Sequence, residues 1–220
     1  MMEKTGAGPR HLEYFLKPKI FIQDVAKSII ACFDDDNNLS TDTLSLIYEI
    51  DSEFNFKYIL TLLNSNFVNK WFKNNFPEGL HIKINQLKQI PIPNISLSEQ
   101  KPFIEKADLM LNLNKEFYDK KNKFFNRIKK SFSLEKLNKK IDSFYESEFN
   151  DFVKEIEKLS KKKTSLKEQD EWEDYFNEYK KDLSNLKNEI EKTDNEINQM
   201  VYKLYGLSKD EIQINEESMK

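Results

Sequence analysis

Two different spacings of apolar residues divide the first 97 residues of the chain into short elements. Runs rich in β-branched and aromatic side chains are typical of strands, whereas apolar positions three and four residues apart are typical of a helix. The first pattern occurs at residues 19–25, 29–33, 44–50 and 80–84, and the second at residues 56–76. These elements predict a small mixed α/β domain over residues 1–97.

Polar and proline-containing segments connect the predicted elements. Residues 1–12 contain two glycines and a proline, which is typical of a flexible lead-in, and the acidic and amide residues at 34–38 predict a hairpin turn. The sequence Ile-Pro-Ile-Pro at 90–93 excludes a central strand. It predicts a stiff, extended exit from the domain.

Beyond residue 98, apolar residues keep the helical spacing and helix-breaking residues are almost absent. The last long helix carries a heptad seam in which only Thr193 is not apolar, and Gly206 is placed to cap its C-terminus. We therefore expect an α+β protein with a long antiparallel helical or coiled-coil arm over residues 98–220. The seam fits pairing within the chain or between chains. The expected helices are 98–128, with Ser98 as N-cap, then 134–159 and 172–204.

Composition limits the function classes. The net charge of −3 argues against a generally basic nucleic-acid coat protein. Residues 1–97 carry 10 basic and 11 acidic residues and the remainder 25 and 27, so charge gives DNA binding no support. No apolar stretch approaches the ~20 residues of a membrane helix, and no signal peptide is present. The single Cys32 lies in an apolar run, which predicts a buried thiol in a cytoplasmic protein.

Several kinds of catalytic and cofactor motif are missing from the sequence. His11 and His81 with one cysteine cannot build a zinc cluster, and no glycine-rich phosphate or dinucleotide loop occurs. Methyltransferase motifs are absent, and Asp24 has no identifiable partner for a metal-dependent nuclease site. We interpret Asp24 as a solvated residue at a strand end. The chain is therefore expected to be no enzyme and to bind no cofactor or metal.

Three segments, taken in order, carry a resemblance to one family. They resemble the C-terminal specificity region of type IIG restriction–modification enzymes, the TaqI-like specificity domain, and are similar to type I specificity subunits. The resemblance covers about residues 15–214. The segments are Lys-Pro-Lys-Ile-Phe-Ile-Gln-Asp-Val at 17–25, Leu-Asn-Ser at 63–65 with Ile-Pro-Ile-Pro at 90–93, and Val-Tyr-Lys-Leu-Tyr-Gly-Leu at 201–207.

The resemblance implies a non-catalytic target-recognition domain that binds double-stranded DNA. The methyltransferase or nuclease would be a domain or subunit supplied elsewhere, and the helical arm would dock that partner or a second copy of the chain. Because family members carry further domains before this region, we expect a fragment, a split-gene product or a free subunit. The alternatives are a helical interaction scaffold that never contacts DNA and, less in keeping with the missing motifs, an enzyme.

The candidate DNA contacts are polar residues near the predicted strands. Lysines can neutralise phosphates, and Asn and Gln can read adenine edges in the major groove; for each residue the alternative is an ordinary solvated side chain. Asn64 and Ser65 either contact phosphates or, as we favour, hold a neighbouring backbone, and Tyr202 and Tyr205 are expected in the core. The candidates are Lys17, Lys19, Lys73, Asn74, Asn75, His81, Lys83, Asn85, Gln86 and Lys88.

Overall fold

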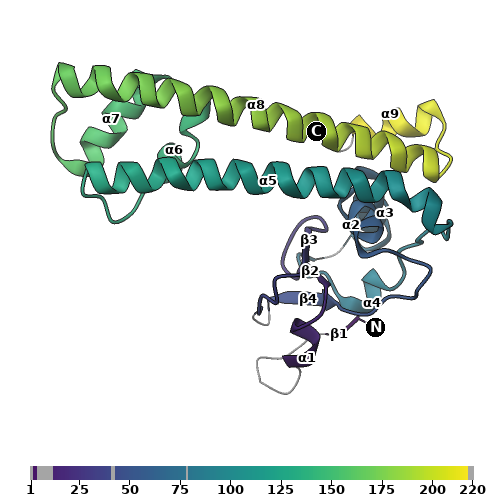
Figure 1. The fold of residues 1–220 in the computed structure, drawn as a ribbon. Helices are drawn as coiled ribbons and strands as arrows, with labels where there is room; N and C mark the ends of the chain where they lie inside the picture. The colour runs from purple at the N-terminus through teal and green to yellow at the C-terminus, as the bar shows by residue number, and fades with distance from the viewer. Residues whose placement is uncertain (1, 4–11, 41–42, 78, 218–220) are drawn as a thin grey trace. The chain divides into compact units, whose positions relative to one another are not determined.

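The computed structural model describes residues 2–3, 12–40, 43–77 and 79–217 and has the expected α+β class (Figure 1). Its contacts form two compact units, unit 1 over residues 1–109 and 193–220 and unit 2 over residues 110–192. Most of the predicted lead-in, residues 4–11, lies outside the described residues. The elements are β1 (Met2–Glu3), α1 (Leu12–Phe15), β2 (Lys19–Gln23), β3 (Ala31–Asp34), β4 (Leu44–Ile47), α2 (Phe56–Asn64), α3 (Asn66–Asn75), α4 (Ile84–Leu87), α5 (Leu97–Ser131), α6 (Lys139–Asp142), the 3-10 turn η2 (Phe144–Glu146), α7 (Phe149–Ser160), α8 (Leu166–Leu204) and α9 (Lys209–Glu217).

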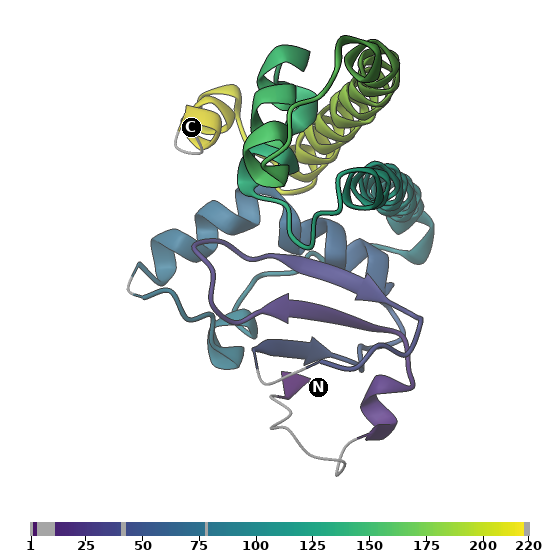
Figure 2. The same ribbon diagram turned by 90° about the vertical axis from the view of Figure 1, so that its left-hand side faces the viewer.

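Unit 1 contains an antiparallel sheet with the strand order β1-β4-β2-β3. Alternation along β2 places Ile20 and Ile22 in the core, and Leu46 of β4 is likewise fully buried. Helices α2 and α3 cover one face of this sheet (Figure 2). The three strands predicted before residue 50 are therefore confirmed in place and type.

The segment between β3 and β4 is not the hairpin turn that its composition predicts. Strand β4 pairs with β2 and not with β3, so the chain leaves β3 at the sheet edge and crosses over β2 to reach its partner. Asn37 has a left-handed backbone with φ of 58°, which amide residues tolerate better than most. The turn chemistry was interpreted correctly, but the connectivity was wrong.

The helix predicted over residues 56–76 is two helices. Ser65 adopts an extended conformation with φ −68° and ψ 151°, and its Oγ accepts a hydrogen bond from the Val68 amide at 3.3 Å. A serine that caps a new helix ends the previous one, even where the apolar spacing continues.

The strand predicted at residues 80–84 was wrong. Only His81 makes a bridge, with Val25, and the chain then turns into the short helix α4. Of the alternating apolar residues, Ile82 is buried but Leu80 is 53% exposed, so the alternation does not mark a ladder of strand pairs.

Helices α5 and α8 run antiparallel, as predicted. Lys106 pairs with Glu196 and Lys120 with Asp182, so 14 residues along α5 correspond to 14 residues back along α8. All members of the predicted seam of α8 are buried or half-buried within this chain, which assigns the seam to intrachain packing. The helix α5 begins one residue before Ser98, because Ser96 forms the capping box with Glu99.

The core of unit 2 is an aromatic cluster between α5, α7 and α8. Phe124 lies at its centre with ring centroids 3.9 Å from Phe144 and 5.2 Å from Tyr179. The helix predicted over residues 134–159 is broken into α6, η2 and α7, since Asn138 caps α6 through the Ile141 amide. The breaks let several aromatic residues turn inward from a short stretch of chain.

The C-terminus of α8 has the predicted glycine cap. Gly206 has φ of +69°, its amide donates to the Lys203 carbonyl, and the Leu207 amide donates to the Tyr202 carbonyl. These two bonds form a Schellman motif, which favours glycine because of the left-handed backbone. Ser208 and Glu211 then cap α9. Within the described ranges, no helix is both long and apolar enough to cross a membrane.

Candidate nucleic-acid interface

A hollow of about 320 Å³ lies in unit 1 where strand β2 ends. Two backbone bonds hold the segment beside it: the Ile82 amide donates to the Asp24 carbonyl at 2.8 Å, and the Ala26 amide donates to the Leu80 carbonyl at 2.9 Å. The lining brings together three of the predicted site residues with Asp24, which directly follows β2, and Ser45 of β4. These residues are Asp24, Ser45, His81, Lys83 and Asn85, with the apolar Ile82 and Ile84 between them.

Asp24 is buried in the wall of this hollow, and the prediction of a solvated strand-end residue was wrong. Its exposed fraction is 3%, and the Ser45 hydroxyl donates to its Oδ1 at 2.6 Å. A buried carboxylate must be hydrogen-bonded to offset its lost hydration. The position of Asp24 directly after a core strand could have indicated its burial. Its partner Ser45 lies 21 residues away, and nothing in the sequence around Ser45 predicts the contact.

The segment over residues 81–88 presents several polar side chains while its apolar residues anchor it. His81, Lys83, Asn85 and Lys88 are exposed, and Leu87 is 2% exposed. The side-chain oxygen of Gln86 accepts a hydrogen bond from the Lys83 amide at 2.9 Å, so that oxygen caps α4. Asn85 is therefore carried on the short helix α4, and His81, Lys83 and Lys88 lie on the chain directly before and after it.

The end of α2 secures the edge strand β3. The Asn64 side chain accepts from the Ala31 amide and donates to the Ala31 carbonyl, both at 2.9 Å. Asn69 reaches the same strand region by accepting from the Ile29 amide at 2.6 Å. The structural role favoured for Asn64 and Ser65 is confirmed, since Asn64 holds a neighbouring strand and Ser65 caps α3.

The comparison with protein families covers this part of the chain. Residues 2–92, which contain the hollow and the contact of Asn64 with β3, match the model of the TaqI-like C-terminal specificity domain. This segment is a TaqI-like specificity domain. A specificity domain of this kind supports DNA sequence recognition in restriction–modification systems. Residues 96–201 match a second family, described as a domain of unknown function (DUF8810), and neither a curated protein nor a solved structure matches the chain.

The exit of the TaqI-like domain is held by two tyrosines. The Tyr58 hydroxyl donates to the Pro93 carbonyl at 2.8 Å, and the Tyr205 hydroxyl donates to the Pro91 carbonyl at 2.6 Å. Burial raises the pKa of Tyr58 to about 12 and raises that of Tyr205 further. The Ile-Pro-Ile-Pro segment is thus fixed from two directions, and Tyr202 is fully buried as predicted while Tyr205 is half-buried.

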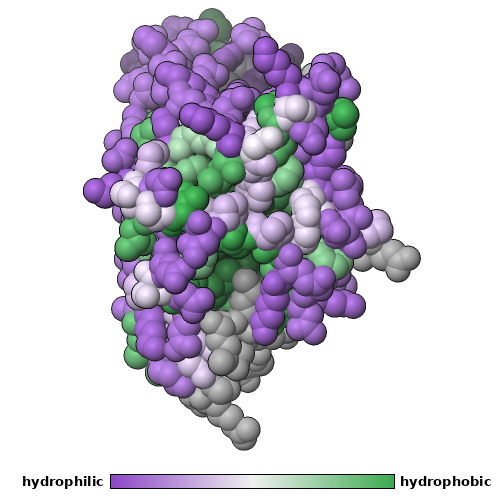
Figure 3. Space-filling model, turned by 90° about the vertical axis from the view of Figure 1, so that its right-hand side faces the viewer, coloured by the Kyte–Doolittle hydropathy of each residue, from purple (hydrophilic) through white to green (hydrophobic). Residues whose placement is uncertain are grey.

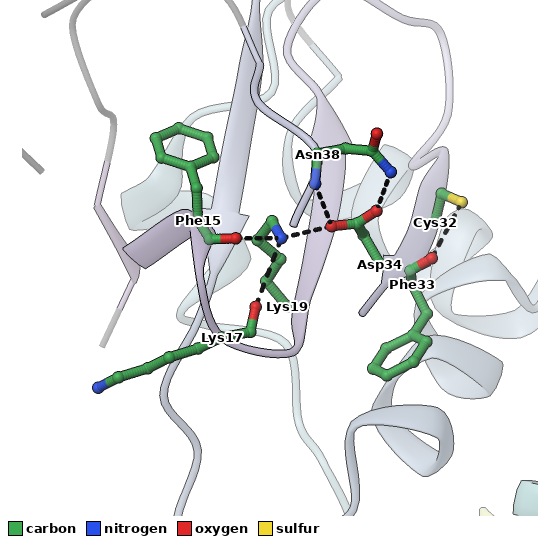
Figure 4. Close-up of polar contacts among 7 residues, drawn as sticks. All are labelled: Phe15, Lys17, Lys19, Cys32, Phe33, Asp34 and Asn38. Carbon is green, nitrogen blue, oxygen red and sulfur yellow. Dashed lines mark hydrogen bonds and ion pairs between the residues drawn. The ribbon is translucent and has the colours of Figure 1, made fainter. Parts of the chain in front are cut away.

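Lys19 is not at the surface of the TaqI-like domain, and its prediction as a DNA contact was wrong. Its exposed fraction is zero, and its ammonium group donates to the Phe15 carbonyl at 2.9 Å and to the Asp34 carboxylate (Figure 4). The Asn38 amide also donates to Asp34, at 3.1 Å. The lysine is therefore a structural cation that ties β2, β3 and the following turn together.

Lys17 and Cys32 lie near that buried pair but differ from it in exposure. Lys17 is half-exposed, 3.7 Å from Glu49, and precedes β2, so it lies at the opposite end of that strand from Asp24. Cys32 is exposed on the edge strand β3, where its thiol donates to the Phe33 carbonyl at 3.5 Å (Figure 4), and the prediction of a core thiol was wrong. An apolar run at a sheet edge places alternate side chains outside the core.

The remaining candidates lie at the end of α3. Lys73, Asn74 and Asn75 are exposed, and the Asn75 side chain donates to the Trp71 carbonyl at 2.8 Å. Asn74 lines a second hollow of about 380 Å³, together with Trp71, residues 205–207 that follow α8, and residues of α9. The described contacts therefore do not bring this group into the hollow of Asp24 and His81.

Proposed function

We propose that this chain recognises a short sequence of double-stranded DNA for a restriction–modification system and positions a methyltransferase or nuclease supplied elsewhere. The observation that supports the proposal most strongly is the hollow of the TaqI-like domain, where His81, Lys83 and Asn85 project from a short, firmly held segment. Base readout needs polar side chains in a fixed geometry, because a bidentate pair distinguishes bases only when its donors and acceptors are aligned.

The exposed residues divide naturally into two roles. Lys83 and Lys88 carry point charges suited to phosphates, whereas Asn85 and His81 carry donors and acceptors suited to base edges. Lys17, Lys73, Asn74, Asn75 and the free amide nitrogen of Gln86 remain candidates for outer contacts. Lys19 is excluded because its charge is neutralised inside the domain.

A protein partner also fits the surface. Figure 3 shows apolar side chains gathered in the middle of one face and surrounded by hydrophilic ones, and the exposed apolar residues of unit 1 include Leu80, Leu97 and Ile214. Contiguous apolar surface of this kind marks contacts with other proteins. We propose that the catalytic partner docks on unit 1 and that the assembly acts in the cytoplasm.

A selection from randomised duplexes tests the proposed function directly. The whole chain should enrich a short sequence, and its binding to that sequence should persist in the presence of competitor DNA. Changing Lys83 and Lys88 to alanine should weaken binding to all sequences and lower the salt dependence, log K against log salt, by about 2 units of slope. Asn85→Ala should instead relax the preference at one position of the sequence.

Lys101→Ala provides the matched control, because Lys101 is an exposed lysine on the first turns of α5. This variant should bind as the wild type does. A chain that enriches no sequence, while folding normally, would favour the alternative of a helical scaffold without DNA contact.

A further inference from the structure

One end of unit 2 concentrates positive charge. Residues 127–140 and 158–167 together contain eleven Lys or Arg residues and a single acidic residue, Glu135, although the whole chain has a net charge of −3. We call these two segments the lysine tip. Neither the match to the specificity domain nor the second family assigns a role to it.

The two segments of the lysine tip come together in space. Lys140 of the first and Lys158 of the second both contact the Glu155 carboxylate, at 3.5 Å and 3.7 Å. Phe132 and Thr164, again one from each segment, line the same small cavity. In Figure 1 the C-terminal ends of α5 and α7 and the start of α8 lie at the same end of unit 2.

The loop between α7 and α8 holds three consecutive lysines at the surface. Lys161, Lys162 and Lys163 are all exposed, and Lys161 ends α7 in a left-handed conformation with φ of 55°. The Glu157 carboxylate accepts from both the amide and the hydroxyl of Thr164, at 2.9 Å each. The loop is therefore anchored through Thr164, and its lysine positions are preorganised.

Glu155 pairs with Lys140 and Lys158 of the tip, but two other nearby carboxylates pair with lysines outside it. Asp142 pairs with Lys121 and Glu148 with Lys180, at 2.8 Å and 2.9 Å, and both lysines lie outside the tip. Among the residues that the structure describes, no ion pair joins a carboxylate to Lys161, Lys162 or Lys163, although the charge of Lys163 helps to lower the pKa of Glu157 after its hydrogen bonds from Thr164. The tip therefore keeps most of its positive charge uncompensated.

The lysine tip ends where α8 begins. The first turns of this helix carry five acidic residues between 168 and 174, as a helix N-terminus favours, and Glu168 folds back to accept from the Ser165 hydroxyl at 2.7 Å. A polyanion therefore has to approach over the end of α5 and the α7–α8 loop. The other flank repels it.

The side chains of the tip distinguish between kinds of polyanion. Its one aromatic residue, Phe132, packs against the core cluster with its ring 5.1 Å from that of Trp172, so the tip exposes no stacking platform for unpaired bases. Contacts between proteins are poor in lysine and rich in aromatic residues, which is the opposite of this surface. Lysines alone suit the regularly spaced phosphates of a duplex.

We propose that the lysine tip binds the phosphate backbone of duplex DNA without regard to sequence, as a second DNA contact separate from the TaqI-like domain. In this arrangement base readout and much of the electrostatic affinity lie in different units of the chain. The contact depends on charge and loop position, and it requires no base-specific group.

A salt titration on a duplex of arbitrary sequence tests the inference. The whole chain and the variant with Lys161, Lys162 and Lys163 all changed to glutamine are titrated with a labelled duplex from low to high salt. The variant should bind more weakly at low salt, and its slope of log K against log salt should be smaller by about 2 to 3, one unit for each lost phosphate contact. The selected sequence of the TaqI-like domain should be unchanged.

The matched control changes Lys115, Lys181 and Lys192 to glutamine, since these exposed lysines lie on α5 and α8 of unit 2 outside the tip. Both variants lose three charges, so a general charge effect would lower both slopes equally and would overturn the inference. An unchanged slope in the tip variant, or displacement of the duplex more readily by poly-glutamate than by unlabelled duplex, would also overturn it. Because the duplex sequence is arbitrary, the result does not depend on whether the chain recognises a sequence.

Discussion

The side-chain amide of Asn64 replaces a missing strand neighbour for Ala31. Both backbone polar groups of Ala31 bond to it at 2.9 Å, as they would to a partner in a ladder. Strand β3 is an edge strand, and an edge with unpaired groups is a site for unwanted pairing with other chains. Asn64 therefore links α2 to the sheet and blocks part of its edge in a single contact.

Asn64→Ala should lower the free energy of unfolding by about 1 to 2 kcal/mol, because two exposed hydrogen bonds are lost. Asn64→Asp keeps the acceptor for the Ala31 amide but places a carboxylate against the Ala31 carbonyl, so it should be no better. Urea denaturation gives the stability, and hydrogen exchange at the Ala31 amide should accelerate in the alanine variant. Unchanged exchange at that amide would show that the contact does not secure the strand.

The ion pair between Lys19 and Asp34 makes a second structural prediction. Lys19→Met should destabilise unit 1 by about 3 to 5 kcal/mol, since it leaves the buried Asp34 carboxylate without its cation. Lys17→Met is the control on the same segment, and because Lys17 is half-exposed its effect should stay within about 0.5 kcal/mol. Equal effects of the two substitutions in urea denaturation would contradict the structural role of Lys19.

The same pair predicts how stability depends on pH. Burial by itself would raise the pKa of Asp34, but hydrogen bonds from Lys19 and Asn38 and the lysine charge outweigh it and lower that pKa below its ordinary value. A lowered folded-state pKa means that the contribution to stability is present above the unfolded pKa of about 3.9 and is lost as pH falls through the folded value. Melting temperatures measured between pH 7 and pH 2 should therefore fall less steeply at the acid end for Asp34→Asn than for the wild type.

Local pattern predicted the elements that depend on neighbouring residues. The strands β2, β3 and β4, the buried seam of α8 and the cap at Gly206 all follow from spacing or from a single conformational need. The failures involve contacts between distant residues. The spacing at 56–76 cannot reveal that Ser65 caps a second helix, and alternation at 80–84 cannot distinguish a strand from a loop packed against one.

The candidate site was predictable only in part for the same reason. The exposed residues His81, Lys83 and Asn85 were found through the resemblance, whereas the burial of Asp24 and Lys19 depends on partners 21 and 15 residues away. The lysine tip illustrates a different limit. Its charge is visible in the sequence, but balance over each half of the chain conceals a cluster that forms only when two segments meet at Glu155.

Tyr58 and Tyr205, which donate hydrogen bonds to the proline segment, should contribute to stability whether or not the chain binds DNA. Tyr58→Phe and Tyr205→Phe each remove one hydrogen bond to a carbonyl of the exit, which should cost about 1 kcal/mol apiece. If both tyrosines hold one segment, the double variant should lose a different amount from the sum of the two single variants. Strict additivity in urea denaturation would indicate that the carbonyls of Pro91 and Pro93 are held separately.

Phe124→Ala should test whether the aromatic cluster stabilises unit 2 on its own. Phe124 has no exposed surface and stacks on Phe144, so its removal leaves a cavity and should cost about 3 to 5 kcal/mol. Tyr118→Ala is the control on the same helix, because Tyr118 is 57% exposed and should change stability little. Hydrogen exchange locates the effect, since amides of α7 should lose protection while those of β2 and β4 keep theirs. The two units have separate cores, and loss of protection in both to the same extent would show instead that they unfold as one cooperative body.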